Sequence, residues 1–325
     1  MGHTPQRESP LGAARTCVTN FVADPTIIAA MDPWPELSIG ASRDTHATLL
    51  LYTQVVGKIR MALTPKTNQW WNVPLYVTAR GLTTSPMPYG DRTLSIDFDF
   101  IDHQLVIRVS DGRTRSLPLV PRSVCDFYRA LFAELAAIDV HVKIHLVPQE
   151  CPVTVPFNDD VEHQSYDASQ AHRLWSVFRR VEPVFQAFRA RFRGKCSPVH
   201  LFWGGLDLAV TRFNGRRAPV RKGTVDRDAY DEEVISVGFW PGDPWTGKTE
   251  AMFYAYTVPE PAGFAQQRVR PDAAFFSDAF KEFMLPYDEV RRAPDPAQAI
   301  LEFAQSTYDV GSTLAEWNRE ALAYP

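Results

Sequence analysis

The chain has 325 residues, of which 45% are hydrophobic and 12% are aromatic, so it can bury a sizeable core. Its formal net charge of -4 provides no overall basic field, which argues against a general nucleic-acid binder. No apolar run approaches the ~20 residues needed to cross a bilayer. We therefore expect a globular protein that neither spans a membrane nor binds nucleic acid generally.

The cysteines and the N-terminus indicate where the protein resides. The four cysteines, Cys17, Cys125, Cys151 and Cys196, lie far apart and form no C-x-x-C pair. This spacing argues against a structural zinc site and is typical of reduced thiols in the cytoplasm. Residues 1–31 lack the apolar core and cleavage site of a signal peptide and are rich in Thr, Pro, Ala and Arg. We expect them to form a disordered N-terminal extension, with Met31 as a hypothetical start of the folded part.

Residues 32–146 are predicted to form a first α+β repeat. An apolar arc that includes Leu51, Val55 and Ile59 predicts a helix capped by Asp44. This helix runs from Asp44 to about Leu63. The predicted strands are Val73–Ala79, Leu82–Ser85, Leu94–Phe100, Gln104–Val109, Thr114–Leu119 and a short Val142–His145, with a loop at Pro86–Gly90 and a second helix from about Pro121 to Ala137.

Residues 147–166 are rich in proline and acidic residues, and we interpret them as a linker. Residues 167–285 are predicted to form a second α+β repeat, and residues 286–325 a C-terminal helical cap. The expected elements are a helix over Asp167–Phe192, two strands within Gly194–Phe213 joined by Gly204-Gly205, strands at Val234–Trp240 and Met252–Val258, a helix over Pro271–Phe283 and a helix from Pro296 to about Val310.

The two predicted repeats align at a fixed displacement. His172 follows His46, and Leu201 follows Leu75, by the same 126 residues, and helix and strands keep this register. We therefore predict an α+β fold of internally duplicated α-β-β-β-β-α units. Their antiparallel sheets would join edge to edge and carry helices on one face, with further helices at the C-terminus.

The best candidate for chemistry lies in Gly194–Phe213. The signatures of P-loop enzymes, zincins and common serine hydrolases are absent from the sequence. His200 and Asp207 flank the Gly-Gly turn, so the carboxylate could orient the imidazole as a general base. Lys195 and Arg212 near the ends of the segment could hold an anionic ligand. The alternative is a buried His–Asp pair in which the two side chains satisfy each other's hydrogen bonds and have no catalytic role.

Further residues are candidates for ligand binding. Lys58 lies on the first helix, and the pair Arg80-Gly81 occupies the place in the first repeat that Leu206-Asp207 occupies in the second, so Arg80 and Asp207 could line one cleft between the repeats. Trp203 and Trp240 belong to a set of tryptophans near strand ends that also includes Trp70, Trp71 and Trp245. These rings are predicted either to wall an apolar pocket or to belong to the core.

Two other chemistries are weaker hypotheses. Cys196 could be a nucleophile assisted by His200, although an unreactive buried thiol is the better interpretation of this residue. His46, His172 and His200 could be combined with Glu232 or Glu233 into a metal site, but their spacing does not demand one. We therefore assign no residue as a metal ligand, and the sequence does not tell whether a metal or another cofactor is bound.

Several segments resemble a known family: Thr53–Arg60, Pro74–Gly81, Gly194–His200, Asp207–Phe213 and Ser236–Gly242. They are similar to a bacterial family of unknown function, family 5996 among the domains of unknown function. The resemblance covers roughly Trp34 to Trp317 and implies a bacterial, cytoplasmic protein. It transfers no catalytic residue, cofactor or substrate, and the segment before Met31 departs from the family.

Two functional hypotheses follow. The first is an enzyme that acts on a small polar or anionic molecule by acid/base chemistry, in a cleft between the two repeats. The second is a non-catalytic protein that binds a ligand or another protein. A small-molecule ligand is expected in the first case; the oligomeric state is not predicted.

Overall fold

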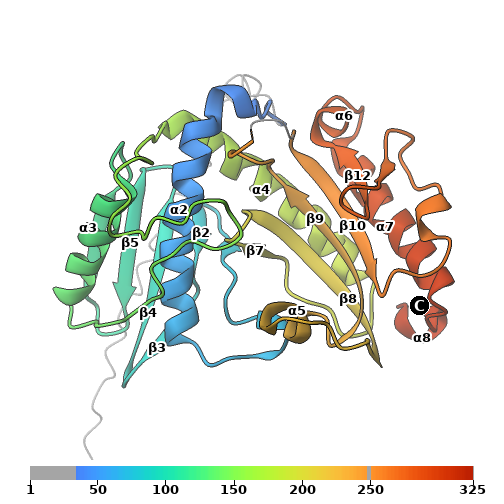
Figure 1. Ribbon diagram of the computed structural model, residues 1–325, viewed down its shortest axis with the longest axis horizontal. Coiled ribbons are helices and arrows are strands. Elements are labelled where there is room, and N and C mark those ends of the chain that lie inside the picture. The colour runs from blue at the N-terminus through green and yellow to red at the C-terminus, as the bar shows by residue number, and fades with distance from the viewer. Residues whose placement is uncertain (1–33, 247–249, 325) are drawn as a thin grey trace, which may run out of the picture. The chain divides into compact units, whose positions relative to one another are not determined.

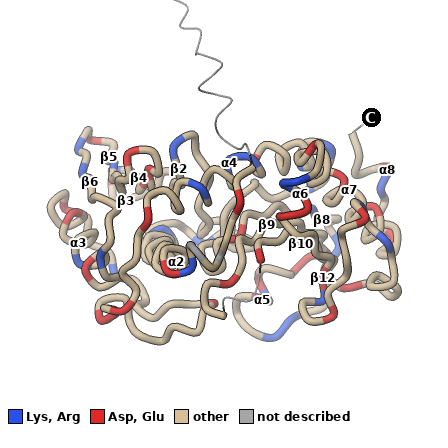
Figure 2. Tube along the Cα trace, turned by 90° about the horizontal axis from the view of Figure 1, so that it is seen from above, with Lys and Arg blue, Asp and Glu red and all other residues tan. Residues whose placement is uncertain are grey.

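The structure is a computed structural model that describes residues 34–246 and 250–324. From Trp34 onward the chain forms one compact unit. The predicted N-terminal extension, residues 1–31, lies outside the described residues. Lysine and arginine residues are interspersed with acidic residues over both sheets (Figure 2). No helix in the described ranges has both the length and the apolar character of a membrane span.

The strands of the described residues form two antiparallel six-stranded sheets (Figure 1). The N-terminal sheet contains β1 (Tyr76–Val77), β2 (Gly81–Thr83), β3 (Met87–Tyr89), β4 (Arg92–Asp99), β5 (Gln104–Val109) and β6 (Thr114–Pro118). Its order is β1-β2-β4-β5-β6, with β3 paired to β4. The C-terminal sheet contains β7 (His200–Phe202), β8 (Asp207–Arg217), β9 (Glu232–Trp240), β10 (Met252–Val258), β11 (Phe275–Ser277) and β12 (Glu282–Pro286) in the order β11-β12-β10-β9-β8-β7. The predicted α+β class with antiparallel sheets is confirmed.

The two sheets meet at their edges β1 and β7. Leu75 and Leu201 form an antiparallel bridge, in which the amide of each donates to the carbonyl of the other at 2.9 and 2.8 Å. These are two of the residues that the displacement of 126 aligns. Both side chains are fully buried, so the apolar core passes under the junction.

The longer helices cover one face of each sheet. The helices are α2 (Ile39–Leu63), α3 (Val124–Ala136), α4 (Ala168–Ala190), α5 (Thr224–Ala229), α6 (Tyr287–Arg291), α7 (Pro296–Leu314) and α8 (Arg319–Leu322), with short 3-10 turns η1 (Asn68–Trp70) and η2 (Phe264–Gln266). The rings of Tyr52 on α2 and Phe127 on α3 stack at 3.8 Å. On the C-terminal sheet, α4 runs behind β8–β10 and α5 lies in front of them (Figure 1).

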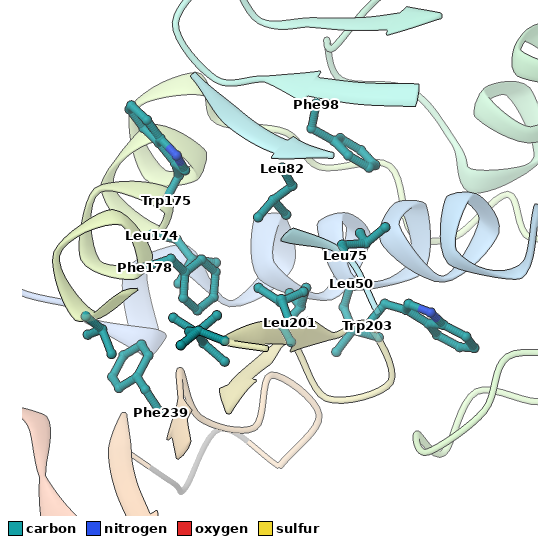
Figure 3. Close-up of a cluster of buried hydrophobic side chains, with 14 of the residues drawn as sticks. Leu50, Leu75, Leu82, Phe98, Leu174, Trp175, Phe178, Leu201, Trp203 and Phe239 are labelled. Carbon is teal, nitrogen blue, oxygen red and sulfur yellow. The ribbon is translucent and has the colours of Figure 1, made fainter. Parts of the chain in front are cut away.

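One continuous core links the two halves (Figure 3). It gathers Leu50 from α2, Leu75, Leu82 and Phe98 from the first half, Leu174, Trp175 and Phe178 from α4, and Leu201, Trp203 and Phe239 from the second half. Each of these side chains is at most 8% exposed. Burial of apolar surface on both sides of the junction therefore stabilises the halves against each other.

The structure corrects several local predictions. Helix α2 begins at Ile39, five residues before the predicted cap Asp44. The predicted loop Pro86–Gly90 contains β3, because the buried Met87 side chain anchors it and Pro88 is tolerated on an edge strand. Residues 142–145, all described, form an irregular loop and not a strand.

The largest error is the predicted helix over Pro271–Phe283. This segment instead forms β11 and the start of β12. The rings of Phe276 and Phe283 pack edge-to-face on each other and on Phe264, with centroids 4.9–6.2 Å apart. Aromatic residues favour a pleated surface, and pairing with β10 satisfies the backbone of β12. The second half therefore does not repeat the predicted order of elements.

Candidate functional site

Alternation along the strands gives the C-terminal sheet two different faces. On β8, Arg212 points toward α4, where its guanidinium lies 3.5 Å from the centroid of the Phe188 ring. Asp207, Thr211 and Phe213 are separated from Arg212 by odd numbers of residues and point to the opposite face. That second face is the floor of a cavity.

The cavity has a volume of about 700 Å³, which lies in the range of small-molecule sites. Every strand of the sheet from β7 to β12 except β11 contributes to the floor, through His200, Asp207, Ser236, Tyr254 and Glu282 among others. The opposite walls come from η1 with Trp70 and Trp71, from the linker with Gln149 and Glu150, and from α5 with Val225 and Asp226. The indole of Trp70 donates to the carbonyl of Val225 at 3.2 Å, which ties η1 to α5.

Asp207 and Tyr254 form the central polar contact of the floor. The Tyr254 hydroxyl donates to Oδ2 of Asp207 at 2.6 Å. The Tyr254 ring lies across Gly238 of the intervening strand β9, where an added Cβ would come within 2.2 Å of the ring. A glycine at this position therefore allows the tyrosine on β10 to reach the carboxylate on β8.

Two carboxyl groups in the cavity titrate near neutral pH. Burial raises the pKa of Asp207 to about 6, and the hydrogen bond from Tyr254 partly opposes this shift. Burial, and then repulsion from Asp207, raises the pKa of Glu282 to about 7. Burial, followed by repulsion from Asp226, also raises the pKa of Glu150. Groups of this kind can give or take a proton at physiological pH.

His200 lines the cavity but does not contact Asp207. On the β7–β8 hairpin His200 pairs with Ala209, whereas Asp207 pairs with Phe202. His200 and Asp207 are therefore diagonal neighbours, which typically lie ~7–8 Å apart. No hydrogen bond joins them within the described residues, so the predicted orienting contact is not formed. Burial, with repulsion from Arg60, lowers the pKa of His200 to about 3, which leaves the imidazole neutral.

The predicted basic clamps lie outside the cavity. Arg80 forms ion pairs on the N-terminal sheet, with Asp99 and Asp102, both at 2.6 Å. Lys195 pairs with Glu232 at 2.6 Å.

Two further cations are held by the backbone. Lys58 is fully buried in α2 and donates to the carbonyls of His145, at 3.2 Å, and Val147. Arg212 donates to the carbonyl of Phe188 on the helix side of the sheet. None of the four basic residues faces the space where a ligand would lie.

The tryptophans are placed differently. Trp203 and Trp240 line the cavity, and so do Trp70 and Trp71. The indole of Trp203 donates to the carbonyl of Val73 at 2.9 Å, which fixes this wall to the first half. Trp245 lies elsewhere, with its ring 5.5 Å from that of His163.

Sequence reasoning did not identify Tyr254, Tyr256 or Glu282. The tyrosines alternate within Met252–Val258, so a face shared with Asp207 could have been inferred from the strand period. Glu282 lies in the segment that was wrongly predicted as a helix, so the sequence did not indicate that it shares a sheet face with Asp207. Burial raises the pKa of the Cys196 thiol to about 11, which argues against its role as a nucleophile. Among the described residues, no group of three or more His, Cys, Asp or Glu side chains is arranged to hold a metal ion.

The raised pKa of Glu282 predicts that Glu282→Gln stabilises the protein by an amount that depends on pH. The folded protein holds this proton more tightly than the unfolded chain does, so the stabilisation is complete below pH ~4.5 and is lost as the pH rises through about 7. The substitution should raise the free energy of unfolding by ~1–3 kcal/mol at pH 8 and have little effect at pH 4.5. Urea unfolding at both pH values measures this. Glu260→Gln on the exposed surface is the control, and an equal effect of Glu282→Gln at both pH values would contradict the shift.

Comparison with known proteins places most of the chain in one family. The model of DUF5996, described as a family of unknown function, matches residues 34–324. No curated protein and no solved structure matches the chain. The site must therefore be interpreted from its own geometry.

Proposed function

Since the chain belongs to the DUF5996 family, whose function is unknown, we propose its activity from the cavity. The protein is an enzyme that acts on a small polar molecule by acid/base chemistry, with Asp207 and Glu282 as the proton-exchanging groups. The observation that carries this proposal is that two carboxyl groups with pKa values of about 6 and 7 share one aromatic-walled cavity.

The two carboxyl groups complement each other. Because the charge of Asp207 disfavours ionisation of Glu282, Asp207 tends to be ionised while Glu282 keeps its proton near neutral pH. The ionised group can accept a proton from a substrate and the protonated group can donate one. Tyr254 fixes the orientation of the Asp207 carboxylate, and the neutral His200 supplies a further polar group on the same floor.

The alternative function is ligand binding without turnover. The same cavity supports it, because enclosure by aromatic walls favours binding whether or not a reaction follows. A surface for a partner protein is less well supported, since the aromatic side chains of the second sheet line a cavity of about 700 Å³ and not a flat face. We also keep two expectations as part of the proposal. One is a bacterial, cytoplasmic protein, of which the cytoplasmic location is supported by the free thiols of the described cysteines. The other is a duplicated origin of the halves, which the Leu75–Leu201 bridge supports.

Conversion of a metabolite tests the enzymatic proposal. Purified protein is incubated with a bacterial small-molecule extract, and the mixture is compared over time by mass spectrometry. We expect one compound to be consumed and a product to appear, with the rate lowered roughly 10²–10⁴-fold by Asp207→Asn. A compound that is retained by the protein but never converted would establish the binding alternative. Conversion at an equal rate by Asp207→Asn would remove Asp207 from the mechanism.

A further inference from the structure

We infer that the ligand of this cavity is an organic cation, an amine or quaternary ammonium with an apolar body, held by carboxylates and aromatic rings. The inference rests on the proposed function, because it concerns the same cavity. It also replaces the anionic ligand that the sequence alone suggested.

The charge of the lining carries the inference. Among the described residues, the charged side chains that line the cavity are Glu150, Asp207, Asp226 and Glu282. All four are acidic, and neither lysine nor arginine accompanies them on this surface. An anion entering this space would meet only like charge, whereas a cation would meet opposite charge.

Three basic residues pack against rings that line the cavity. Lys195 lies 4.6 Å from the ring centroid of Phe213 and Lys66 lies 4.3 Å from that of Trp70, and both are engaged by acidic partners. Arg221 stacks at 4.5 Å on Tyr230 and is exposed. These lining rings already attract cations, although none of the three basic residues itself lines the cavity.

The aromatic walls suit a positive charge. Trp70, Trp71, Trp203 and Trp240 contribute indoles, the side chain for which a cation has the strongest preference. Aromatic rings around a carboxylate form the arrangement that recognises alkylammonium groups. Ala209, Val234 and Met284 on the floor are apolar and leave room for the body of such a molecule.

A second observation points to a ligand independently of the acidic groups. His200 is 1% exposed and lines the cavity, and its Nδ1 has no hydrogen-bond partner among the described residues. A buried polar atom without a partner is costly unless a ligand or water satisfies it. The imidazole is neutral, so it can accept an N–H of a primary amine without repelling the charge.

The state of the carboxyl groups then depends on the ligand. Asp207 and Glu282 are protonated more readily than usual because burial penalises their ionisation, with added repulsion from Glu150 at Asp207 and from Asp207 at Glu282. A bound cation offsets both penalties, so binding should release protons and strengthen as the pH rises. Burial also raises the pKa of Glu150, so this group acts in the same direction. The remaining titratable groups that line the cavity are Asp226, which adds an acidic side chain, and His200, Tyr230, Tyr254 and Tyr256, which stay neutral over this range.

Isothermal titration calorimetry of the full chain with matched probes tests the inference. The probes are phenethylamine and benzyltrimethylammonium as cations, 2-phenylethanol as the neutral control and phenylacetate as the anion. We expect each cation to bind at least 10-fold more tightly than the neutral and anionic probes at pH 8, and the affinity to fall about 10-fold at pH 5.5. Glu282→Gln should weaken cation binding about 10-fold at pH 8 and leave the neutral probe unchanged, whereas Glu260→Gln should change neither.

Three results would overturn the inference: no binding of either cation at millimolar concentration, equal affinity for the neutral probe, or a preference for phenylacetate. Probe selectivity is measured on the unaltered protein, so it does not depend on any variant folding. Failure of this inference is distinguishable from failure of the proposed enzyme. Conversion of a neutral or anionic metabolite that depends on Asp207 would refute the cationic ligand and support the proposed enzyme. Binding of the cation probes, with no metabolite converted, would support the cationic ligand and refute the proposed enzyme.

Discussion

Replacing Gly57 by alanine should destabilise the protein by about 2–4 kcal/mol, although alanine is the better helix former by up to ~1 kcal/mol. Gly57 lies in the interior of α2, and a Cβ there would come within 2.3 Å of the Trp203 indole. The indole is 6% exposed and donates to the carbonyl of Val73. Moving it would break this buried hydrogen bond and displace one wall of the cavity. Urea unfolding measures the change in stability.

Gly40 provides a matched control in the same helix. A Cβ at Gly40 would have Ser38 Oγ, at 3.9 Å, as its nearest neighbour, so Gly40→Ala should be neutral or stabilise by up to ~1 kcal/mol. Opposite signs for the two substitutions are the expected result. Equal gains from both would show that Trp203 does not pack against α2.

Replacing Arg212 should separate a structural role from the ligand role that the sequence suggested. Arg212 is 1% exposed, and its guanidinium lies 3.5 Å from the ring centroid of Phe188 and 4.3 Å from that of Tyr308. Arg212→Ala removes this packing and should cost ~3–5 kcal/mol. Arg212→Met fills much of the same volume without a buried charge and should cost less than ~2 kcal/mol.

The ligand role makes a different prediction for the same variants. Because Arg212 faces the helices and not the cavity, Arg212→Met should leave the affinity for the cation probes within about 2-fold of the unaltered protein. Thermal unfolding and calorimetry on one preparation give both readouts. If methionine were as damaging to stability as alanine, the guanidinium would contribute more than its packing. If methionine selectively abolished probe binding, the assignment of Arg212 to the helix face would be wrong.

Elements with a clear local period were predictable from the sequence. The strict alternation of Leu94–Phe100 lies within β4 up to Asp99, and the predicted strand Met252–Val258 coincides with β10. Side-chain period and burial are local properties there, so neighbouring residues suffice to define them. Phe275–Pro286 lacked such a signal. Its conformation depends on packing against Phe264 and pairing with β10, which lie elsewhere in the chain.

The site was predictable to the extent that strand alternation defines it. His200, Asp207, Trp203 and Trp240 line the cavity, whereas Arg212 does not. The odd separation between Asp207 and Arg212 in one continuous strand already assigns them to opposite faces. No local pattern shows that Arg80 pairs with Asp99, or that Lys195 pairs with Glu232. Removing these cations from the candidate site required the tertiary structure.

The cavity takes its floor from one half of the chain and much of its opposite wall from the other. Because the complete lining requires both halves, a ligand that contacts both links its occupancy to the association of the halves. A molecule between Trp70 on η1 and Tyr254 on β10 would cross-link them, adding to the backbone bridge at Leu75 and Leu201. The bound protein should therefore resist separation of the two sheets more strongly than the empty one, and ligand concentration would act as a control on the rigidity of the whole fold.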